Sequence, residues 1–177
     1  TLLQRHLQRL KQAGIERIVI NVAYLHEKII AAVQNMPFDG IELQFSEELS
    51  GSLETAGGIL QALPLIDAEQ FLVVNADIWT DFDFSTVLRS TVQDSLAHLV
   101  MVDTPVEKQS NDFYLDDTGR LNSQGVGKGL TFSGISLLRN ELFDGLSPGK
   151  RALKPILDGA IIGSQVSAEH YAGQWYD

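Results

Sequence analysis

The sequence contains no cysteine, and this absence excludes several kinds of chemistry. Without thiols the chain can form no disulfide, no thiolate nucleophile and no cysteine-bound zinc site. Histidine is also scarce, and its positions lack the spacing of metal ligands, so a histidine zinc site is not expected. The histidines are His6, His26, His98 and His170. No serine lies in the pattern of a nucleophile elbow, which argues against a hydrolase triad.

Positive charge is scarce as well. The chain has 13 Lys and Arg residues against 23 Asp and Glu residues, which gives a formal net charge of −10. A protein that binds a nucleic-acid backbone needs a basic surface to displace counterions, so nucleic acid is not expected as a partner. A small phosphorylated ligand is compatible with this charge, because a metal ion or a helix N-terminus can supply positive potential locally.

Long apolar runs are also lacking, and none approaches the roughly 20 residues of a membrane span, so no membrane partner is expected. A length of 177 residues and a hydrophobic fraction of 44% favour a single domain with a substantial core. The sequence begins at Thr1 without a signal-like segment and stops at Asp177, directly after an aromatic-rich segment. We therefore expect a piece of a longer protein, located in the cytoplasm because no export signal is visible.

Helical and extended patterns alternate along the first half of the chain. The predicted helices cover residues 2–10, 26–33, 55–63 and 83–92, and the predicted strands cover residues 15–22, 41–45, 71–74 and 97–102. Regular alternation favours parallel βαβ units in a doubly wound sheet. After Asp103 the pattern changes to a hairpin at 113–121, a strand at 130–138, a helix at 153–162 and an extended segment at 166–177.

The segment that follows Phe71–Val74 is the first candidate site. Phe71–Val74 is a short apolar run without helical period, which predicts a strand buried on both faces. Asp77 then falls at the carboxyl end of that strand, where open α/β sheets bind ligands. The alternative is that Asn75 and Asp77 only make turn hydrogen bonds. We interpret the nearby Asp81 and Asp83 as a turn residue and a helix cap.

The second candidate site is the sequence Glu54-Thr55-Ala56-Gly57-Gly58. Thr55 is a possible helix cap, and two glycines in a first helical turn need a reason, since each costs about 1 kcal/mol relative to alanine. One reason is that bare backbone amides at a helix N-terminus let a planar or anionic ligand come close. The other is close packing of a short helix on its sheet.

Asp77 and Asp177 form a third candidate, a pair of carboxylates that could converge at the edge of the sheet. Two such groups can hold Mg²⁺ when water and phosphate oxygens complete its coordination. A site of this kind suits phosphoryl-type transfer. The alternative is that Asp177 is an ordinary exposed residue at the end of the sequence.

Five segments taken in order resemble the sugar-1-phosphate nucleotidyltransferases. They are LETAGGI, then FLVVNADIWTDFDF about 12 residues later, LAHLVMVDTP with NDF, LTFSGISLL, and EHYAGQWYD. The resemblance covers essentially the whole chain and is nearest to the bacterial N-acetylmuramate-1-phosphate uridylyltransferases, followed by guanylyltransferase-like relatives. It implies a Rossmann-like, glycosyltransferase-A-like α/β fold with a mostly parallel sheet. It also implies transfer of a nucleotidyl group from a nucleoside triphosphate, with UTP favoured, to a sugar 1-phosphate.

The resemblance assigns roles to the candidate residues. Asp77 and Asp177 match the catalytic aspartates that hold Mg²⁺ beside the α-phosphate. The nucleotide is expected at Glu54, Thr55, Ala56, Gly57, Gly58 and Asn75, and the sugar phosphate at Asn111, Asp112, Gly134 and Glu169. A thymidylyl, guanylyl or adenylyl enzyme is the alternative within the class, and a non-catalytic regulatory subunit is the alternative outside it.

The sequence departs from the family at both ends. The family begins with a strand and a glycine-rich loop that grips the triphosphate, and it usually continues past its last aspartate with a helix. We expect residues 1–177 to be a nucleotidyltransferase domain that lacks these parts. Because the first strand is central in such a sheet, we expect exposed backbone edges and poor solubility or inactivity when these residues are expressed alone.

Overall fold

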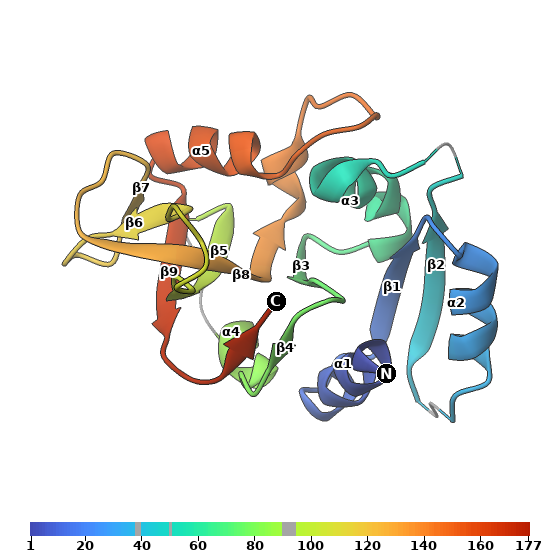
Figure 1. Ribbon diagram of the computed structural model, residues 1–177. Coiled ribbons are helices and arrows are strands. Elements are labelled where there is room, and N and C mark those ends of the chain that lie inside the picture. The colour runs from blue at the N-terminus through green and yellow to red at the C-terminus, as the bar shows by residue number, and fades with distance from the viewer. Residues whose placement is uncertain (38–39, 50, 90–94) are drawn as a thin grey trace. The chain divides into compact units, whose positions relative to one another are not determined.

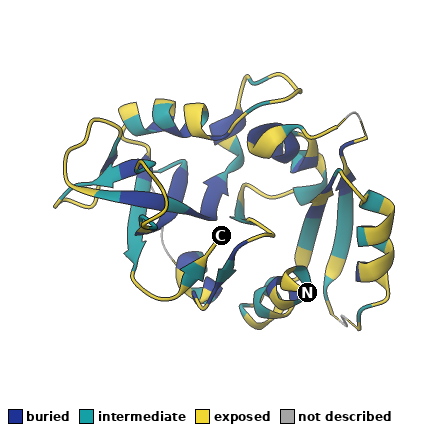
Figure 2. Ribbon diagram, viewed as in Figure 1, coloured by how far each residue is buried: buried dark blue, intermediate teal, exposed yellow. Residues whose placement is uncertain are grey.

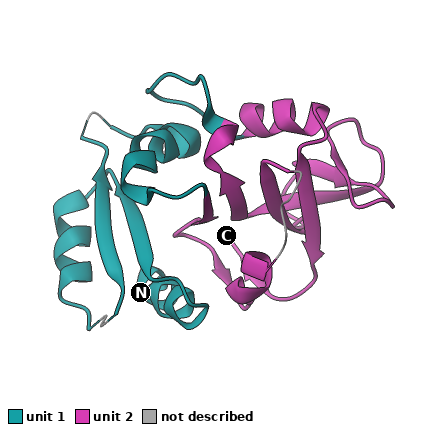
Figure 3. Ribbon diagram, turned by 180° about the vertical axis from the view of Figure 1, so that it is seen from behind, with its two compact units in different colours: residues 1–69, 143–153 teal, residues 70–142, 154–177 magenta. Residues whose placement is uncertain are grey.

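The computed structural model describes residues 1–37, 40–49, 51–89 and 95–177. The chain forms two compact units, drawn in separate colours in Figure 3. Unit 1 comprises residues 1–69 and 143–153, and unit 2 comprises residues 70–142 and 154–177. No helix in the described ranges is both long and apolar enough to cross a membrane.

Unit 1 contains three helices and a two-stranded parallel sheet among its described residues. Its elements are α1 (Leu2–Gln12), β1 (Arg17–Val22), α2 (His26–Gln34), β2 (Glu42–Glu47) and α3 (Glu54–Ile66). Strands β1 and β2 pair in parallel along their whole length, with Arg17 opposite Glu42. One buried apolar cluster of this unit consists of Leu7, Ile20, Val22 and Val33. The β-branched residues of β1 thus bury one face of a short sheet.

Helix α1 shows how local sequence sets an element. The hydroxyl of Thr1 accepts a hydrogen bond from the backbone amide of Gln4 at 3.2 Å, which satisfies one of the free amides of the first turn. Gly14, the residue predicted to follow the helix, has φ of +90°, a left-handed conformation that favours glycine. The amphipathic pattern of the first ten residues therefore predicted a helix that the structure confirms.

Unit 2 is built around a six-stranded sheet. The strands of the whole unit are β3 (Gln70–Val74), β4 (Trp79–Thr80), β5 (Ala97–Asp103), β6 (Phe113–Leu115), β7 (Leu121–Asn122), β8 (Lys128–Arg139), β9 (Val166–Tyr171) and β10 (Trp175–Tyr176). The sheet runs in the order β7-β6-β8-β5-β9, and β3 adds to β8 (Figure 1). Strands β4 and β10 form a separate antiparallel pair. The helices are α4 (Phe84–Arg89) and α5 (Lys154–Ile162), and the 3₁₀ helix η1 (Asn140–Phe143) follows β8.

The α/β class is confirmed, but the sheets are mixed rather than mostly parallel. Of the seven strand pairs in the described residues, only β1–β2 and β5–β9 are parallel. The cause is the long strand β8, which lies antiparallel between β5 on one side and β3 and β6 on the other. The regular alternation of the first half of the chain did not reveal that β8 enters between strands that precede it.

The core of unit 2 lies under β5 and β8, which are coloured as buried over most of their length in Figure 2. Leu99, Val100 and Met101 on β5 are fully buried, as are Ile135 and Leu138 on β8. The near-continuous apolar runs of both strands explain this burial, because a strand covered on both faces needs apolar residues at every position.

Strand β3 exists as predicted, but it is half-buried rather than buried on both faces. In the described part of the chain it is hydrogen-bonded only to β8, so its other edge carries no strand. Strand β1 likewise has β2 as its only strand neighbour among the described residues. An apolar run thus predicted the strand correctly but overestimated its burial.

Two helix boundaries differ from the prediction. Helix α3 continues through Pro64 to Ile66 instead of ending before it. Pro64 lies in the last turn of α3. Its missing amide and the clash of its ring with the preceding turn therefore affect only the end of the helix. Helix α4 begins after Asp83, as predicted, and is described to Arg89, while residues 90–92 of the predicted helix lie outside the described residues.

Candidate active site

The two-stranded pair β4–β10 joins the chain segments next to the predicted carboxylates Asp77 and Asp177. Trp175 pairs with Thr80, and Tyr176 pairs with Trp79. Continuing this register by one residue sets Asp177 opposite Ile78, which directly follows Asp77. Asp77 and Asp177, 100 positions apart in sequence (177 minus 77), thus both lie within two residues of the same end of one short ribbon. The pairing of β4 with β10 was not predicted from the sequence, and a shared metal-binding role of the two carboxylates stays a prediction.

Both carboxylates are exposed, and neither has a hydrogen-bond or ion-pair partner among the described residues. No group of three potential metal-ligating side chains occurs in the described part of the chain, so the two aspartates would hold a cation by themselves. That donor set fits Mg²⁺, which keeps several waters and is commonly bound by one or two carboxylates plus phosphate oxygens. It does not fit a fully protein-enclosed cation.

A bulge in β8 anchors the segments that carry these aspartates. Met101 pairs with Phe132 and Val100 pairs with Ile135, so Ser133 and Gly134 have no partner on β5. Such extra residues bend a strand and free its backbone groups for other contacts. The carbonyl groups of these two residues make contacts outside the β5–β8 register.

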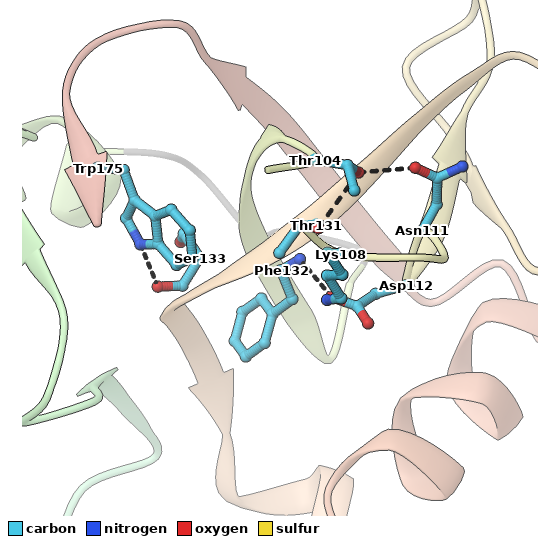
Figure 4. A network of polar contacts seen from close by, with 8 residues as sticks. All are labelled: Thr104, Lys108, Asn111, Asp112, Thr131, Phe132, Ser133 and Trp175. Carbon is cyan, nitrogen blue, oxygen red and sulfur yellow. Dashed lines mark hydrogen bonds and ion pairs between the residues drawn. The ribbon is translucent and has the colours of Figure 1, made fainter. Parts of the chain in front are cut away.

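Each of these two carbonyls is taken by a segment that leads to an aspartate. The backbone amide of Asn75 donates to the Gly134 oxygen at 2.9 Å, two residues before Asp77. The indole Nε1 of Trp175 donates to the Ser133 oxygen at 2.8 Å, two residues before Asp177 (Figure 4). The bulge thus fixes both approaches to the carboxylate pair.

Gly134 has a structural reason to be glycine. Its φ is +79°, and a Cβ atom built there would lie 2.8 Å from Cγ of Asn75. The residues predicted to contact sugar and nucleotide, Gly134 and Asn75, are therefore packed against each other. A side chain at position 134 would displace Asn75 and, with it, the start of the Asp77 turn.

The neighbouring aspartates differ from Asp77 because their carboxylates are already bonded. Asp83 accepts hydrogen bonds from the amide and the hydroxyl of Ser85, both at 2.9 Å, which confirms its predicted capping role. Asp81 was interpreted as a local turn residue, and this is wrong. Its Oδ1 accepts from the backbone amide of Gln174 at 2.9 Å and from the hydroxyl of Tyr171, so it binds a distant segment.

Asn111, predicted to face the sugar, is held by a chain of hydroxyl groups. Thr131 donates to Thr104 at 3.2 Å, and Thr104 donates to the Asn111 amide oxygen at 2.7 Å (Figure 4). The amide also packs on Gly129, where a Cβ atom would overlap it. Because its oxygen is engaged, Asn111 presents its amide NH₂ group as a donor.

Asp112, the residue after Asn111, has different hydrogen-bond partners. Its Oδ2 accepts from Nζ of Lys108 at 2.6 Å and from the backbone amide of Phe132 at 2.9 Å (Figure 4). The second bond fixes β8 directly before the bulge. Asp112 therefore has a clear structural role, and direct contact with a sugar stays a prediction.

Glu169 lies apart from the other predicted sugar residues. It is opposite Val100, which in turn is opposite Ile135, so β5 separates Glu169 from β8. Its Oε1 lies 3.4 Å from Nε2 of His98, whose Nδ1 is 2.9 Å from the hydroxyl of Ser167. The carboxylate is thus engaged with a largely buried histidine.

In unit 1, the amides at the start of α3 are already bonded. The amides of Ala56 and Gly57 both donate to the carbonyl of Arg151, at 3.0 and 3.1 Å. The amide of Arg151 donates in return to the carbonyl of Leu53 at 2.9 Å. The prediction that Thr55 caps this helix is wrong, since the cap residue is Leu53 and a distant backbone carbonyl satisfies the amides.

Both glycines of α3 are buried and closely packed. A Cβ atom at Gly57 would overlap the carbonyl of Gly149, and one at Gly58 would lie 2.6 Å from both Asn21 Nδ2 and Glu48 Oε1. Close packing therefore accounts for the glycine pair, the second of the two reasons considered for it. No ligand contact is needed to explain these residues.

Glu48 is a supporting residue that sequence reasoning did not single out. It is only 9% exposed, and it accepts hydrogen bonds from the amide of Leu53 at 2.7 Å and from Nδ2 of Asn21 at 3.3 Å. A buried carboxylate needs such partners. Glu48 thus ties the end of β1 to the loop that leads into α3.

Glu54 and Thr55 are the exposed residues of the α3 start. Glu54 has φ of +59°, a strained conformation for a residue with a side chain, and its carboxylate lies 3.6 Å from Nζ of Lys150. Backbone strain of this kind costs about 1–3 kcal/mol and often occurs at ligand sites. The part of this segment that a ligand can reach is therefore formed by these side chains.

Comparisons with known proteins identify the family. The family model described as nucleotidyl transferase matches residues 1–114. The chain is 43% identical over 178 residues to an N-acetylmuramate alpha-1-phosphate uridylyltransferase from Neisseria meningitidis serogroup B, covering 97% of this chain and 77% of that relative. The chain belongs to the nucleotidyl transferase family.

Solved structures share the fold. HddC from Yersinia pseudotuberculosis, complexed with GMP-PN, has a TM-score of 0.79 at 22% identity, covering 99% of this chain and 78% of that one. A putative glucose-1-phosphate thymidylyltransferase from Bacillus anthracis, in complex with sucrose, has a TM-score of 0.82 at 14% identity, covering 99% and 76%. The protein is thus a nucleotidyltransferase with the α/β fold of these enzymes.

Proposed function

We propose that this nucleotidyltransferase transfers the uridylyl group of UTP to N-acetylmuramic acid 1-phosphate. Support comes from the 43% identical uridylyltransferase, whose match covers nearly the whole chain. The observation in the structure that carries the proposal is that Asp77 and Asp177, next to the same end of the β4–β10 ribbon, are both exposed and have no partner among the described residues. The reaction would serve the recycling of cell-wall sugars in the cytoplasm.

The proposed reaction is a phosphoryl-type substitution. An oxygen of the sugar phosphate attacks the α-phosphorus of UTP, the new P–O bond forms, and the bond to pyrophosphate breaks. Catalysis of this kind rests on positioning and charge neutralisation more than on covalent chemistry. Mg²⁺, when bound, supplies the neutralising charge, and Asp77 and Asp177 are the residues that would hold it.

The remaining residues take the binding roles in this proposal. Residues 1–177 act as one nucleotidyltransferase domain. The nucleotide is assigned to Asn75 and to the segment Glu54, Thr55, Ala56, Gly57 and Gly58. In that segment it contacts the exposed side chains of Glu54 and Thr55, while the buried Ala56, Gly57 and Gly58 support them from below. The sugar phosphate contacts Asn111, Asp112, Gly134 and Glu169, with the Asn111 NH₂ group as a donor to a substrate oxygen.

The test is pyrophosphate release by the full-length protein. Each of UTP, dTTP, GTP, CTP and ATP is combined with N-acetylmuramic acid 1-phosphate, N-acetylglucosamine 1-phosphate, glucose 1-phosphate and mannose 1-phosphate, with Mg²⁺ present. We expect the highest kcat/KM for UTP with N-acetylmuramic acid 1-phosphate. A higher value for another pair would reassign the substrates, and no release with any pair would contradict the proposed reaction.

A further inference from the structure

We propose that Asp81 is a positioning residue for Asp177, acting through the turn between β9 and β10. The inference rests on the proposed metal role of Asp177. Asp81 itself touches neither substrate nor metal in this arrangement. It holds the chain segment that delivers Asp177 to its place beside Asp77.

The first observation is that Thr80 and Asp81 bind the turn at several atoms. The Asp81 carboxylate accepts from the hydroxyl of Tyr171 and from the amide of Gln174. The carbonyl of Gln174 accepts in return from the Thr80 hydroxyl at 2.9 Å and from the Asp81 amide at 3.3 Å. Both ends of the turn are therefore attached to one short segment, and β10 begins directly after it.

The second observation is that the turn is shaped around the phenol of Tyr171. The ring packs edge-on against Phe82, with a centroid distance of 5.0 Å and an interplanar angle of 86°. A Cβ atom at Gly173 would overlap the Tyr171 hydroxyl and ring. Position 173 therefore has no room for a side chain while the hydroxyl reaches Asp81, so the glycine serves this contact.

The third observation is the short distance along the chain from this attachment to the proposed metal site. Gln174 is three residues before Asp177, and the intervening strand has only two residues, Trp175 and Tyr176. Trp175 adds its indole bond to the Ser133 carbonyl. With so few residues between, loss of the Asp81 contacts would let β10 shift and would move the Asp177 carboxylate away from Asp77.

Residues that orient metal ligands affect metal affinity or activity by about 10–100-fold when they are removed. We therefore expect Asp81→Ala to raise the Mg²⁺ concentration for half-maximal turnover at least tenfold and to lower kcat. The KM for the sugar phosphate should stay within about twofold of the wild-type value, because the substrate contacts are untouched. A role in folding alone would not produce this split between metal dependence and KM.

The experiment compares Asp81→Ala with four further variants of the full-length protein. Asp81→Asn keeps one oxygen that can accept both hydrogen bonds, so it should restore most of the Mg²⁺ response. Tyr171→Phe removes a single donor and should shift the response a few-fold, which tests the inference even if Asp81→Ala does not fold. Asp83→Ala, which removes the neighbouring capping carboxylate, is the matched control and should leave the Mg²⁺ response unchanged. Asp177→Asn tests the proposed metal site itself.

A second readout avoids turnover. Mn²⁺ is titrated into each variant with UDP-N-acetylmuramic acid present, and free Mn²⁺ is measured by electron paramagnetic resonance. We expect an approximately tenfold weaker Mn²⁺ affinity for Asp81→Ala and a wild-type affinity for Asp83→Ala.

Three outcomes would overturn the inference: an unchanged metal response in Asp81→Ala or Tyr171→Phe, an equal loss in Asp83→Ala, or no rescue by Asp81→Asn. If Asp177→Asn has normal turnover and metal affinity, the proposed metal pair itself fails, and the inference fails with it. If Asp177→Asn is impaired while Asp81→Ala behaves as wild type, only the positioning role fails.

Discussion

The start of α3 in unit 1 and the Asp77–Asp177 pair in unit 2 are both predicted ligand sites, yet their bonding differs. At α3 the amides of Ala56 and Gly57 donate to the Arg151 carbonyl, and neighbouring groups fill the space that a side chain at Gly57 or Gly58 would need. In unit 2 the supporting residues are bonded while the two aspartates are left exposed without a partner among the described residues.

The bonding at the two sites shows where hydrogen-bonding groups remain available for a ligand. A helix N-terminus with two glycines suggests an anion site, but here another backbone carbonyl already occupies it. The aspartates keep their oxygens available, while the adjacent Asp81 and Asp83 use theirs within the protein. The two predicted sites therefore differ in whether their hydrogen-bonding groups are already used within the protein, although the residue types at both are typical of ligand sites.

Turnover should fall most when the carboxylate of Asp77 or of Asp177 is removed. Asp77→Asn and Asp177→Asn should each lower kcat at least about 100-fold, because loss of a metal ligand removes several kcal/mol of transition-state stabilisation. The midpoint of urea unfolding should stay near that of wild type, since neither carboxylate has a partner in the described protein. Near-normal turnover in both variants would remove the contrast between the two sites.

The close packing around Gly57 in α3 predicts an effect on stability, and this effect is smaller than the expected loss of turnover. Gly57→Ala should lower the free energy of unfolding by about 1–3 kcal/mol, because the new Cβ meets a backbone carbonyl that cannot move cheaply. Gly159→Ala in α5 is the matched control, since nothing lies within 4 Å of its Cβ position and alanine favours helix by up to about 1 kcal/mol. Urea denaturation measures both variants. Equal stability in the two would contradict packing as the reason for Gly57.

Glu48 tests whether the α3 support affects the nucleotide rather than the metal. Glu48→Ala leaves the Leu53 amide and the Asn21 side chain without their acceptor, which should cost about 1–3 kcal/mol of stability. The KM for UTP should rise several-fold because the loop before Glu54 loses its attachment. The Mg²⁺ concentration for half-maximal turnover should not change, opposite to the expectation for Asp81→Ala. Steady-state kinetics at varied UTP and Mg²⁺ separate the two, and Glu48→Gln, which keeps an acceptor oxygen, should be milder.

Local pattern predicted most elements, because their causes are local. The helical periodicity before Gly14, the apolar runs of β5 and β8, and the Asp83 cap each depend on residues close in sequence. The α/β class could also be inferred. The mixed sheet could not, because the place of β8 between β5 and β3 depends on pairing across more than 60 residues of sequence, as from Phe71 to Leu138.

The supports of the candidate site were missed for the same reason. Asp81 reads locally as a turn residue, and only the fold brings Gln174 to it, 93 positions later. The Arg151 carbonyl that caps α3 has no side-chain signature at all, since any residue could supply it. For Trp175 the available signal was its aromatic-rich neighbourhood, which does not reveal a bond to the Ser133 carbonyl.

The mildest change is expected at Asp103, a carboxylate of unit 2 that, unlike Asp77, has ion-pair partners among the described residues. Its hydrogen bond with Lys128 lowers the pKa of Asp103 below the usual 3.8, and the charge of a protonated His170 acts in the same direction. A lowered folded-state pKa stabilises the protein above pH 3.8, and this contribution is lost as the pH falls through the folded-state pKa. Lys128→Ala should therefore reduce stability at pH 7, by less than about 1 kcal/mol because the pair is exposed and screened.

The difference in stability between Lys128→Ala and wild type should become smaller in acid, because Asp103 is then protonated in both the folded and the unfolded chain. Urea denaturation of the variant and wild type across the acid range measures it. Lys28→Ala serves as the control, since Lys28 is an exposed lysine without an ion-pair partner in the described ranges. A Lys128→Ala effect that is independent of pH would show that packing, and not the pairing of Asp103, sets the stability difference. It would also weaken the contrast between paired and unpaired carboxylates from which the role of Asp77 is inferred.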